Sequence, residues 1–225
     1  MTAPRPLRTE CLRGVVFDLD GTLVDGYLGI ATAVNAARAA YGLPALAGED
    51  VRGRVGLGLS HLMEDVVGRA RAEAAAAIFR SVYDRVCVEQ TRPVAALDAT
   101  LAALRARGFR LSVASNKPVA YSIRILERLG VLSSFDTIEG PETAGVLKPD
   151  PAMIRACLAA MGLGADEAVY VGDMTLDADA GVAAGVSVVL VSGGSSAAEA
   201  LRDTGHPVLG TLGELLDVLP RKARI

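Results

Sequence analysis

Two carboxylates stand one residue apart near the start of the chain, directly after a short apolar run. The run Val15–Phe17 is rich in β-branched and aromatic residues, which favours a buried strand. Because side chains alternate along a strand, Asp18 and Asp20 are expected to point the same way, with Leu19 turned into the core. Close like charges raise each other's pKa, and a cation between them would remove that cost. The pattern therefore predicts a cation site where the first strand ends.

Further polar side chains follow the other predicted strands. Ser115 and Asn116 follow the second strand, Lys148 lies in the loop after the third, and Asp173 follows the fourth, with Asp177 one helical turn later. In an open parallel sheet the carboxyl ends of the strands lie at one edge, where ligands bind. These groups can therefore converge although they are far apart in sequence. Only three of the 23 basic residues are lysines, so each lysine is more often needed as an ammonium than as a generic surface cation.

The rest of the sequence predicts the elements that bring these groups together. Apolar spacing predicts helices over 27–41, 61–69 and 72–89, with Ser60 as the N-cap of the second, and no clear strand from 26 to 92. Beyond residue 94, strands are expected at 109–114, 135–139, 168–171, 186–191 and near 208, and helices at 96–107, 119–129, 151–161, 177–184 and 197–202. This alternation predicts an α/β fold with a doubly wound parallel sheet, into which a small helical unit is inserted after the first strand.

Composition excludes several classes of protein. The net charge of -3 provides no basic surface for nucleic acid, and no apolar run approaches the roughly 20 residues that a membrane helix needs. Residues 1–13 lack the apolar segment of a signal peptide, which favours a cytoplasmic protein. The three cysteines are odd in number and widely spaced, which favours free thiols over a disulfide framework or a zinc site.

Four short motifs in chain order resemble the haloacid dehalogenase superfamily. They are Asp18-x-Asp20-Gly21-Thr22, Ser115, Lys148-Pro149 and Gly172-Asp173-x-x-x-Asp177. Each stands at a predicted boundary between elements, and together they extend over nearly the whole chain. The resemblance implies a core domain from residues 1–24 and 93–225, and a helical cap domain from residues 25–92 with hinges near 24–26 and 88–93. Cap closure over substrate would exclude water.

The resemblance also implies roles for these residues. Asp18 would be the nucleophile that forms an aspartyl-phosphate, and Asp20 the acid that protonates the leaving oxygen and later activates water. A metal site for Mg²⁺ would use Asp18 and Asp173, the backbone carbonyl of Asp20, and Asp177 close by. Phosphate oxygens would be held by Ser115, Lys148 and backbone N–H groups around Gly21, Thr22 and Asn116. Asp20 argues against dehalogenation, because that reaction needs only the nucleophile.

Several interpretations stay open at this point. Asp177 and Ser115 could be helix caps with no role in the site, or members of the site. Lys117 could simply lie at a helix N-terminus, or it could take part in the site. Ser115-Asn116-Lys117-Pro118 and Val55-Gly56-Leu57-Gly58 resemble phosphoglycolate phosphatases, whereas 92–94 and 140–145 depart from them.

The first functional hypothesis is a Mg²⁺-dependent hydrolase of a small phosphorylated metabolite, with 2-phosphoglycolate as a candidate substrate, in a monomer or homodimer. A sugar phosphomutase of the β-phosphoglucomutase type would share every core residue. A receiver-like phosphoacceptor domain would share the acidic pocket, but it has no counterpart of Asp20 or of the inserted helices.

Overall fold

A single parallel sheet forms the centre of the molecule. The computed structural model describes residue 7 and residues 9–221. The prediction that 1–13 is not a signal peptide falls mostly on residues outside this range. The sheet has six strands in the order β5-β4-β1-β6-β7-β8. The strands are β1 Gly14–Phe17, β4 Arg110–Ala114, β5 Thr137–Glu139, β6 Ala168–Gly172, β7 Ser187–Val191 and β8 Val208–Leu209. All pair in parallel, which confirms the predicted doubly wound α/β fold.

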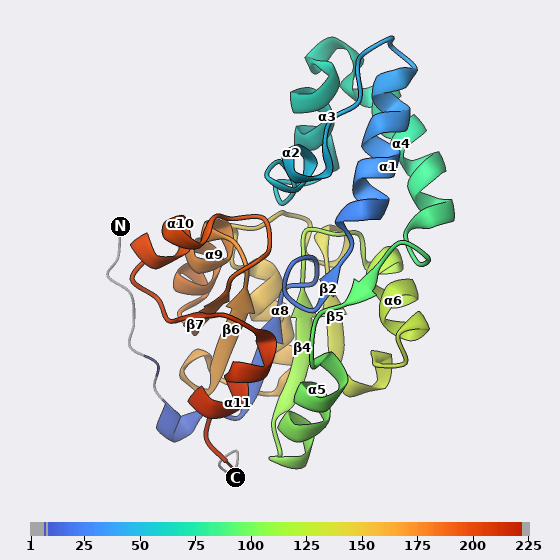
Figure 1. The fold of residues 1–225 in the computed structure, drawn as a ribbon. Helices are drawn as coiled ribbons and strands as arrows, with labels where there is room; N and C mark the ends of the chain where they lie inside the picture. Colours follow the sequence, from blue (N-terminus) through green and yellow to red (C-terminus); the bar gives the residue numbers. More distant parts are fainter. Residues whose placement is uncertain (1–6, 8, 222–225) are drawn as a thin grey trace.

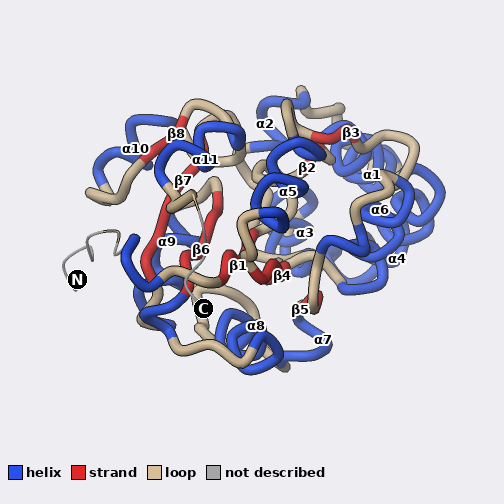
Figure 2. The backbone as a smooth tube through the Cα atoms, turned by 90° about the horizontal axis from the view of Figure 1, so that it is seen from below, coloured by secondary structure: helices blue, strands red, loops and turns tan. Residues whose placement is uncertain are grey.

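Helices cover both faces of this sheet. Their bounds are α5 Leu97–Ala106, α6 Val119–Arg128, α7 Pro141–Ala144, α8 Ala152–Met161, α9 Thr175–Ala184, α10 Ala198–Asp203 and α11 Leu215–Val218. Alternate residues of β6 face opposite layers: Val169 and Val171 pack in the cluster with α5 and α6, whereas Ala168 and Tyr170 pack with α8 and α9. Figure 2 shows α5 and α8 on opposite sides of the row of strands. Burial on both faces explains why these strands read as continuous apolar runs.

The helices between β2 and β3 form a unit with its own apolar core. They are α1 Tyr27–Ala39, α2 Gly48–Arg52, α3 Leu59–Val67 and α4 Ala72–Val86, and we call them the helical unit. Residues such as Val34, Met63 and Phe79 bury their side chains in a cluster separate from those of the sheet. Figure 1 shows the helical unit above the edge of the sheet where the parallel strands end. An insertion at this position is what the sequence predicted.

Two expectations about this region are wrong. No strand was expected between 26 and 92, but Arg92–Pro93 forms β3, which pairs antiparallel with β2, Val24–Asp25, where the chain enters and leaves the helical unit. A two-residue strand containing proline has no periodicity to detect. Ser60 is not an N-cap, because α3 already begins at Leu59 after Gly58, whose φ of 86° an L-residue rarely adopts.

Short 3₁₀ helices occupy Thr9–Cys11, Arg69–Arg71, Leu132–Ser134, Ala165–Glu167 and Leu212–Glu214. Cys11, Cys87 and Cys157 are free, as predicted. Among the described helices, none combines the length and the hydropathy needed to cross a membrane.

Candidate active site

Three carboxylates meet at the carboxyl edge of the sheet. Asp18 follows β1, Asp173 follows β6, and Asp177 lies in the first turn of α9. One oxygen from each lies within 4.8 Å of one from each of the others, and all three residues are buried. Burial, followed by the charges of Asp177 and Asp18, raises the pKa of Asp173 well above its usual value. The cluster supplies only oxygen donors and carries a cost that a divalent cation would remove, so these residues fit Mg²⁺.

The Asp173 carboxylate is held by three donors. Thr22 Oγ1 donates at 3.2 Å, the backbone N–H of Ser195 at 2.6 Å, and the hydroxyl of Tyr27 at 3.4 Å. Glycine at 21 leaves room for this carboxylate, because a Cβ there would stand 2.4 Å from Asp173 Oδ2. Gly21 also has a φ of 87°, so two independent constraints require glycine at this turn.

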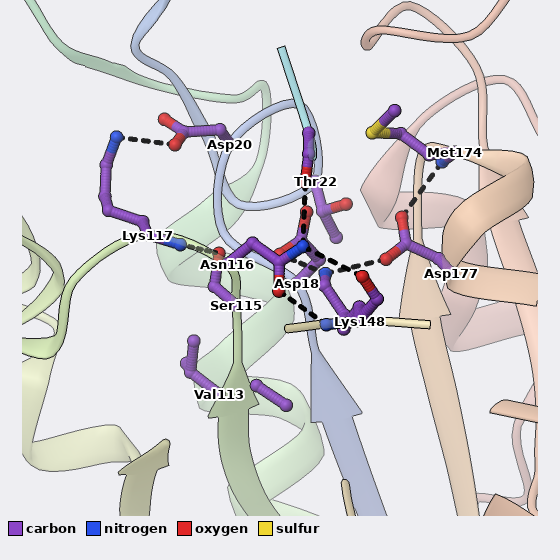
Figure 3. A network of polar contacts seen from close by, with 12 residues as sticks. Asp18, Asp20, Thr22, Val113, Ser115, Asn116, Lys117, Lys148, Met174 and Asp177 are labelled. Atoms are coloured by element: carbon purple, nitrogen blue, oxygen red, sulfur yellow. Dashed lines mark hydrogen bonds and ion pairs between the residues drawn. The ribbon is translucent and has the colours of Figure 1, made fainter. Parts of the chain in front are cut away.

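Lys148 lies between two of the acids. Its ammonium forms an ion pair with Asp18 Oδ1 at 2.8 Å and with Asp177 Oδ1 at 2.7 Å (Figure 3). It also donates to the hydroxyl of Tyr170 at 2.9 Å. Burial alone would lower the pKa of Lys148, but the charges of Asp177 and Asp18 outweigh it and raise that pKa. Lys148 therefore stays charged and offsets part of the negative charge of the cluster.

Asp177 contacts both the start of α9 and Lys148. Its Oδ2 accepts the backbone N–H groups of Asp173 and Met174, each at 3.0 Å, while its Oδ1 accepts from Lys148 and Tyr170. The interpretation of Asp177 as the N-cap of a helix over 177–184 is wrong, because α9 begins at Thr175 with Met174 at the N-cap position, and Asp177 accepts the Met174 N–H from within the first turn. Its carboxylate belongs to the acidic cluster, and direct metal ligation by Asp177 stays a prediction.

Ser115 and Asn116 lie beside Lys148 at the end of β4. The Asn116 amide accepts the N–H of Lys148 at 2.7 Å and donates to the carbonyls of Gly56, 2.8 Å, and Lys148, 3.3 Å. Ser115 Oγ accepts the N–H of Lys117 at 3.4 Å. Asn116 therefore holds the backbone of the loop that carries Lys148, and it also links the core to the helical unit.

The turn after β1 corrects one prediction about phosphate binding. The N–H of Gly21 donates to the Val24 carbonyl at 2.7 Å and that of Thr22 to the Leu19 carbonyl at 3.3 Å, so the turn itself uses them. Within the described part of the chain, the N–H groups of Leu19 and Asp20 have no hydrogen-bond partner. Those two groups, two residues earlier than Gly21 and Thr22, are the free donors of this turn.

Asp20 points away from the three acids. Its Oδ2 pairs with the ammonium of Lys117 at 2.6 Å (Figure 3). Lys117 also donates to the hydroxyl of Tyr83 in α4 at 2.7 Å. Burial raises the pKa of Asp20 and outweighs the opposing effect of Lys117. The expectation that Asp18 and Asp20 point the same way fails because β1 ends at Phe17, so strand alternation does not extend to Asp20.

A cavity of about 110 Å³ lies between the sheet edge and the helical unit. The predicted catalytic side chains all line it, namely Asp18, Asp20, Ser115 and Lys148. Its opposite wall is mostly apolar and comes from the helical unit, including Ile30, Val55, Leu59, Leu62 and Phe79. Glycines in the 55–58 loop let the two parts approach, because a Cβ on Gly56 would stand 2.4 Å from Met174 and one on Gly58 2.9 Å from Leu147.

Comparison with known proteins gives the family. The model of the haloacid dehalogenase-like hydrolases matches residues 15–191, which is most of the chain. The chain belongs to this family. A phosphoglycolate phosphatase of Yersinia pseudotuberculosis is 35% identical over 221 residues, covering 95% of this chain and 94% of that protein. One from Cereibacter sphaeroides is 37% identical over 216 residues, covering 92% and 98%.

Solved structures agree with this assignment. A "predicted phosphoglycolate phosphatase" from Haemophilus somnus 129PT superposes with a TM-score of 0.83 at 26% identity, covering 92% of this chain and 97% of that one. A "predicted phosphatase" from Clostridium acetobutylicum gives 0.85 at 23% identity, covering 93% and 98%, and so supports the fold alone. The predicted family and enzyme class are confirmed: the chain is a haloacid dehalogenase-like hydrolase with phosphatases as its relatives.

Within this family member, the structure adds residues that the sequence did not single out. Tyr83 contacts Lys117, Tyr170 contacts Lys148, and Tyr27 and Ser195 contact Asp173. Tyrosines inside apolar helices and strands look like ordinary core residues. The one available signal was the rarity of lysine, which pointed to both Lys117 and Lys148.

Proposed function

We propose that this protein is a Mg²⁺-dependent phosphomonoester hydrolase that works through an aspartyl-phosphate on Asp18. The observation that carries the proposal is the division of acids around one cavity. Asp18 lies in the acidic cluster beside Lys148, whereas Asp20 lines the same cavity with its carboxylate outside the cluster. A nucleophile and a proton donor in separate electrostatic surroundings are what phosphoryl transfer to a carboxylate requires.

Asp18 and Asp173 would hold Mg²⁺, together with the backbone carbonyl of Asp20. When bound, the ion neutralises charge on the phosphoryl group and on the carboxylates. Asp177 then keeps its place in the first turn of α9 and as the partner of Lys148.

The first step transfers the phosphoryl group to Asp18. An Asp18 oxygen bonds to phosphorus while the bond from phosphorus to the leaving oxygen breaks, and Asp20 gives its proton to that oxygen. The free N–H groups of Leu19 and Asp20, with Ser115, are placed to donate to phosphate oxygens. In the second step Asp20 takes a proton from water, the water oxygen bonds to phosphorus, and Asp18 leaves.

The helical unit would act as the cap over this reaction, with the core formed by 1–24 and 93–225 and the cap by 25–92. The paired strands β2 and β3 place both connections side by side, which suits a hinge. The cavity is small and the relatives are named phosphoglycolate phosphatases, so 2-phosphoglycolate is the first candidate substrate. A cytoplasmic location and a monomeric or homodimeric state stay predictions.

The test is phosphate release from a panel of small phosphomonoesters, with and without Mg²⁺, by wild type and by Asp18→Asn. We expect release that needs both Mg²⁺ and Asp18, with 2-phosphoglycolate ranked above sugar phosphates. Folding of Asp18→Asn is checked by circular dichroism. Release by folded Asp18→Asn at the wild-type rate would end the proposal, and an isomerised sugar phosphate without free phosphate would replace it with the phosphomutase.

A further inference from the structure

One buried ammonium joins the core to the helical unit. Lys117, in the loop after β4, contacts Asp20 at 2.6 Å and the Tyr83 hydroxyl at 2.7 Å, and all three residues line the cavity. The side chains of Lys117 and Asp20 are only 6% and 10% exposed, so water does not compete for the pair. Figure 3 shows this pair on the opposite side of Asp18 from Lys148 and Asp177.

Tyr83 has a fixed position in α4. Its ring stacks on Phe79 with centroids 5.3 Å apart and meets the edge of Tyr121 at 5.1 Å. Burial raises the pKa of Tyr83 to about 12, so the phenol stays neutral and accepts from Lys117 at neutral pH. The Lys117 ammonium therefore has one fixed acceptor on each side of the cavity.

Other contacts hold the two parts of the molecule together without Lys117. Asn116 donates to the Gly56 carbonyl, and Arg52 donates to the Gly193 carbonyl at 2.8 Å. A buried ion pair is a weak source of stability, because the loss of solvation offsets most of the attraction. Stability therefore does not explain why Lys117 stands here rather than an apolar side chain, whereas control over Asp20 does.

We propose that Tyr83 and Lys117 form a positioning pair, which holds the Asp20 carboxylate on the leaving-group side of the cavity while the helical unit is closed over the core. In this role neither residue needs to touch the transferred phosphoryl group. When the unit opens, Tyr83 leaves with α4 and Lys117 loses its second acceptor. Proton donation by Asp20 is thereby tied to closure. This inference rests on the proposed function, in which Asp20 is the acid.

The leaving group of the substrate provides the test. An alkoxide needs a proton as it departs, whereas the acetate that leaves acetyl phosphate does not. We would measure kcat/KM for acetyl phosphate and for the best alkyl phosphate of the panel, since kcat/KM reports only steps through transfer to Asp18. The variants are Tyr83→Phe, which keeps the ring, and Lys117→Met. Tyr41→Phe is the matched control, because it removes a hydroxyl from the same helical unit away from the cavity.

General acid catalysis is worth roughly 100-fold to 10,000-fold, so its partial loss should lower the alkyl phosphate value about tenfold or more. We expect that fall in Tyr83→Phe and Lys117→Met, with acetyl phosphate changed less than about threefold and Tyr41→Phe unchanged. In an Asp20→Asn background, adding Tyr83→Phe should not change the ratio of kcat/KM for the alkyl phosphate to kcat/KM for acetyl phosphate.

The inference would be overturned if folded Tyr83→Phe kept the wild-type kcat/KM for both substrates. It would also be overturned if kcat/KM fell equally for both, because an equal fall indicates a structural role. If Lys117→Met does not fold, Tyr83→Phe decides alone. Failure of the proposed function looks different, because wild type would then show no turnover that depends on Asp18.

Discussion

Replacing Lys148 with methionine isolates the charge that balances the acidic cluster. Methionine keeps the length and the apolar stem of the side chain but removes the ammonium. The contacts with Asp18 at 2.8 Å and Asp177 at 2.7 Å are lost together with the donor to Tyr170. Three buried carboxylates then remain without a positive charge within the cluster.

The magnitude follows from these distances. At an effective dielectric constant of about 20, each ion pair contributes roughly 6 kcal/mol of attraction. The cost of burying the ammonium offsets several kcal/mol of that sum, and truncating one partner of a buried pair typically destabilises a protein by about 3–5 kcal/mol. We therefore expect the free energy of unfolding of Lys148→Met to fall by about 3–5 kcal/mol at neutral pH without added metal.

The loss should depend on pH in a defined direction. The pKa values of Asp173 and Asp177 are already raised above 3.8 by burial, and Lys148 opposes that rise. A carboxyl with a raised pKa in the folded state binds protons more readily than in the unfolded chain, so its contribution to stability falls as pH rises above 3.8 through the raised value. Lys148→Met removes the charge that opposes this rise, so it raises both pKa values further. The loss in free energy of unfolding relative to wild type should therefore be larger at about pH 8 than at about pH 5.

Urea unfolding at both pH values, with and without Mg²⁺, measures these quantities. Mg²⁺ should reduce the deficit, since it supplies the missing positive charge. Arg13→Met is the control, because its ion pair with Glu167 is also 2.8 Å long but its side chain is 41% exposed, and the expected loss is below about 1 kcal/mol. A Lys148→Met deficit as small as that of Arg13→Met, and the same at both pH values, would refute the charge-balance reasoning.

Two further predictions concern the same edge of the sheet. Asp20→Asn should slow turnover of an alkyl phosphate at least about 100-fold while leaving Mg²⁺-induced stabilisation intact, because its side chain lies outside the acidic cluster; equal loss of Mg²⁺ stabilisation in thermal unfolding would contradict this. Gly194→Ala should weaken Mg²⁺ binding in titration calorimetry, because its Cβ would stand 2.0 Å from Asp173 Oδ2, whereas Gly48→Ala, with open space around it, should bind as wild type does.

Much of the fold was predictable because its signals are local. Apolar runs such as Val186–Val191 are buried on both faces, and helices end at glycines such as Gly162 and Gly185, whose positive φ values end the helix. The family motifs were predictable for a related reason. Asp18 and Asp173 directly follow strands, and Lys148 lies in the connection from β5 to α8, so approximate element boundaries were enough to place all three at one edge.

The contacts across the cavity were not predictable, because they depend on packing between distant segments. Lys117 reaches Asp20 and Tyr83, which lie far from it in sequence and on two different parts of the molecule. No periodicity in α4 distinguishes Tyr83 from the other core residues of that helix. The direction of Asp20 was mispredicted because strand geometry was extended beyond Phe17, into a turn whose path is set by Gly21.

The distribution of charge separates the two lysines by function. Asp18, Asp173 and Asp177 bring three formal negative charges to one cluster and Lys148 brings one positive charge, which leaves an excess of two. The Asp20–Lys117 pair carries no net charge when Asp20 is ionised and one positive charge when Asp20 is protonated, so it brings no excess of negative charge. A divalent cation is therefore expected beside Asp18 and Asp173, where it neutralises the excess, and not beside Asp20. In the proposed mechanism the Asp20 side chain would therefore not ligate the metal, and its carboxyl group would stay available to give and take a proton.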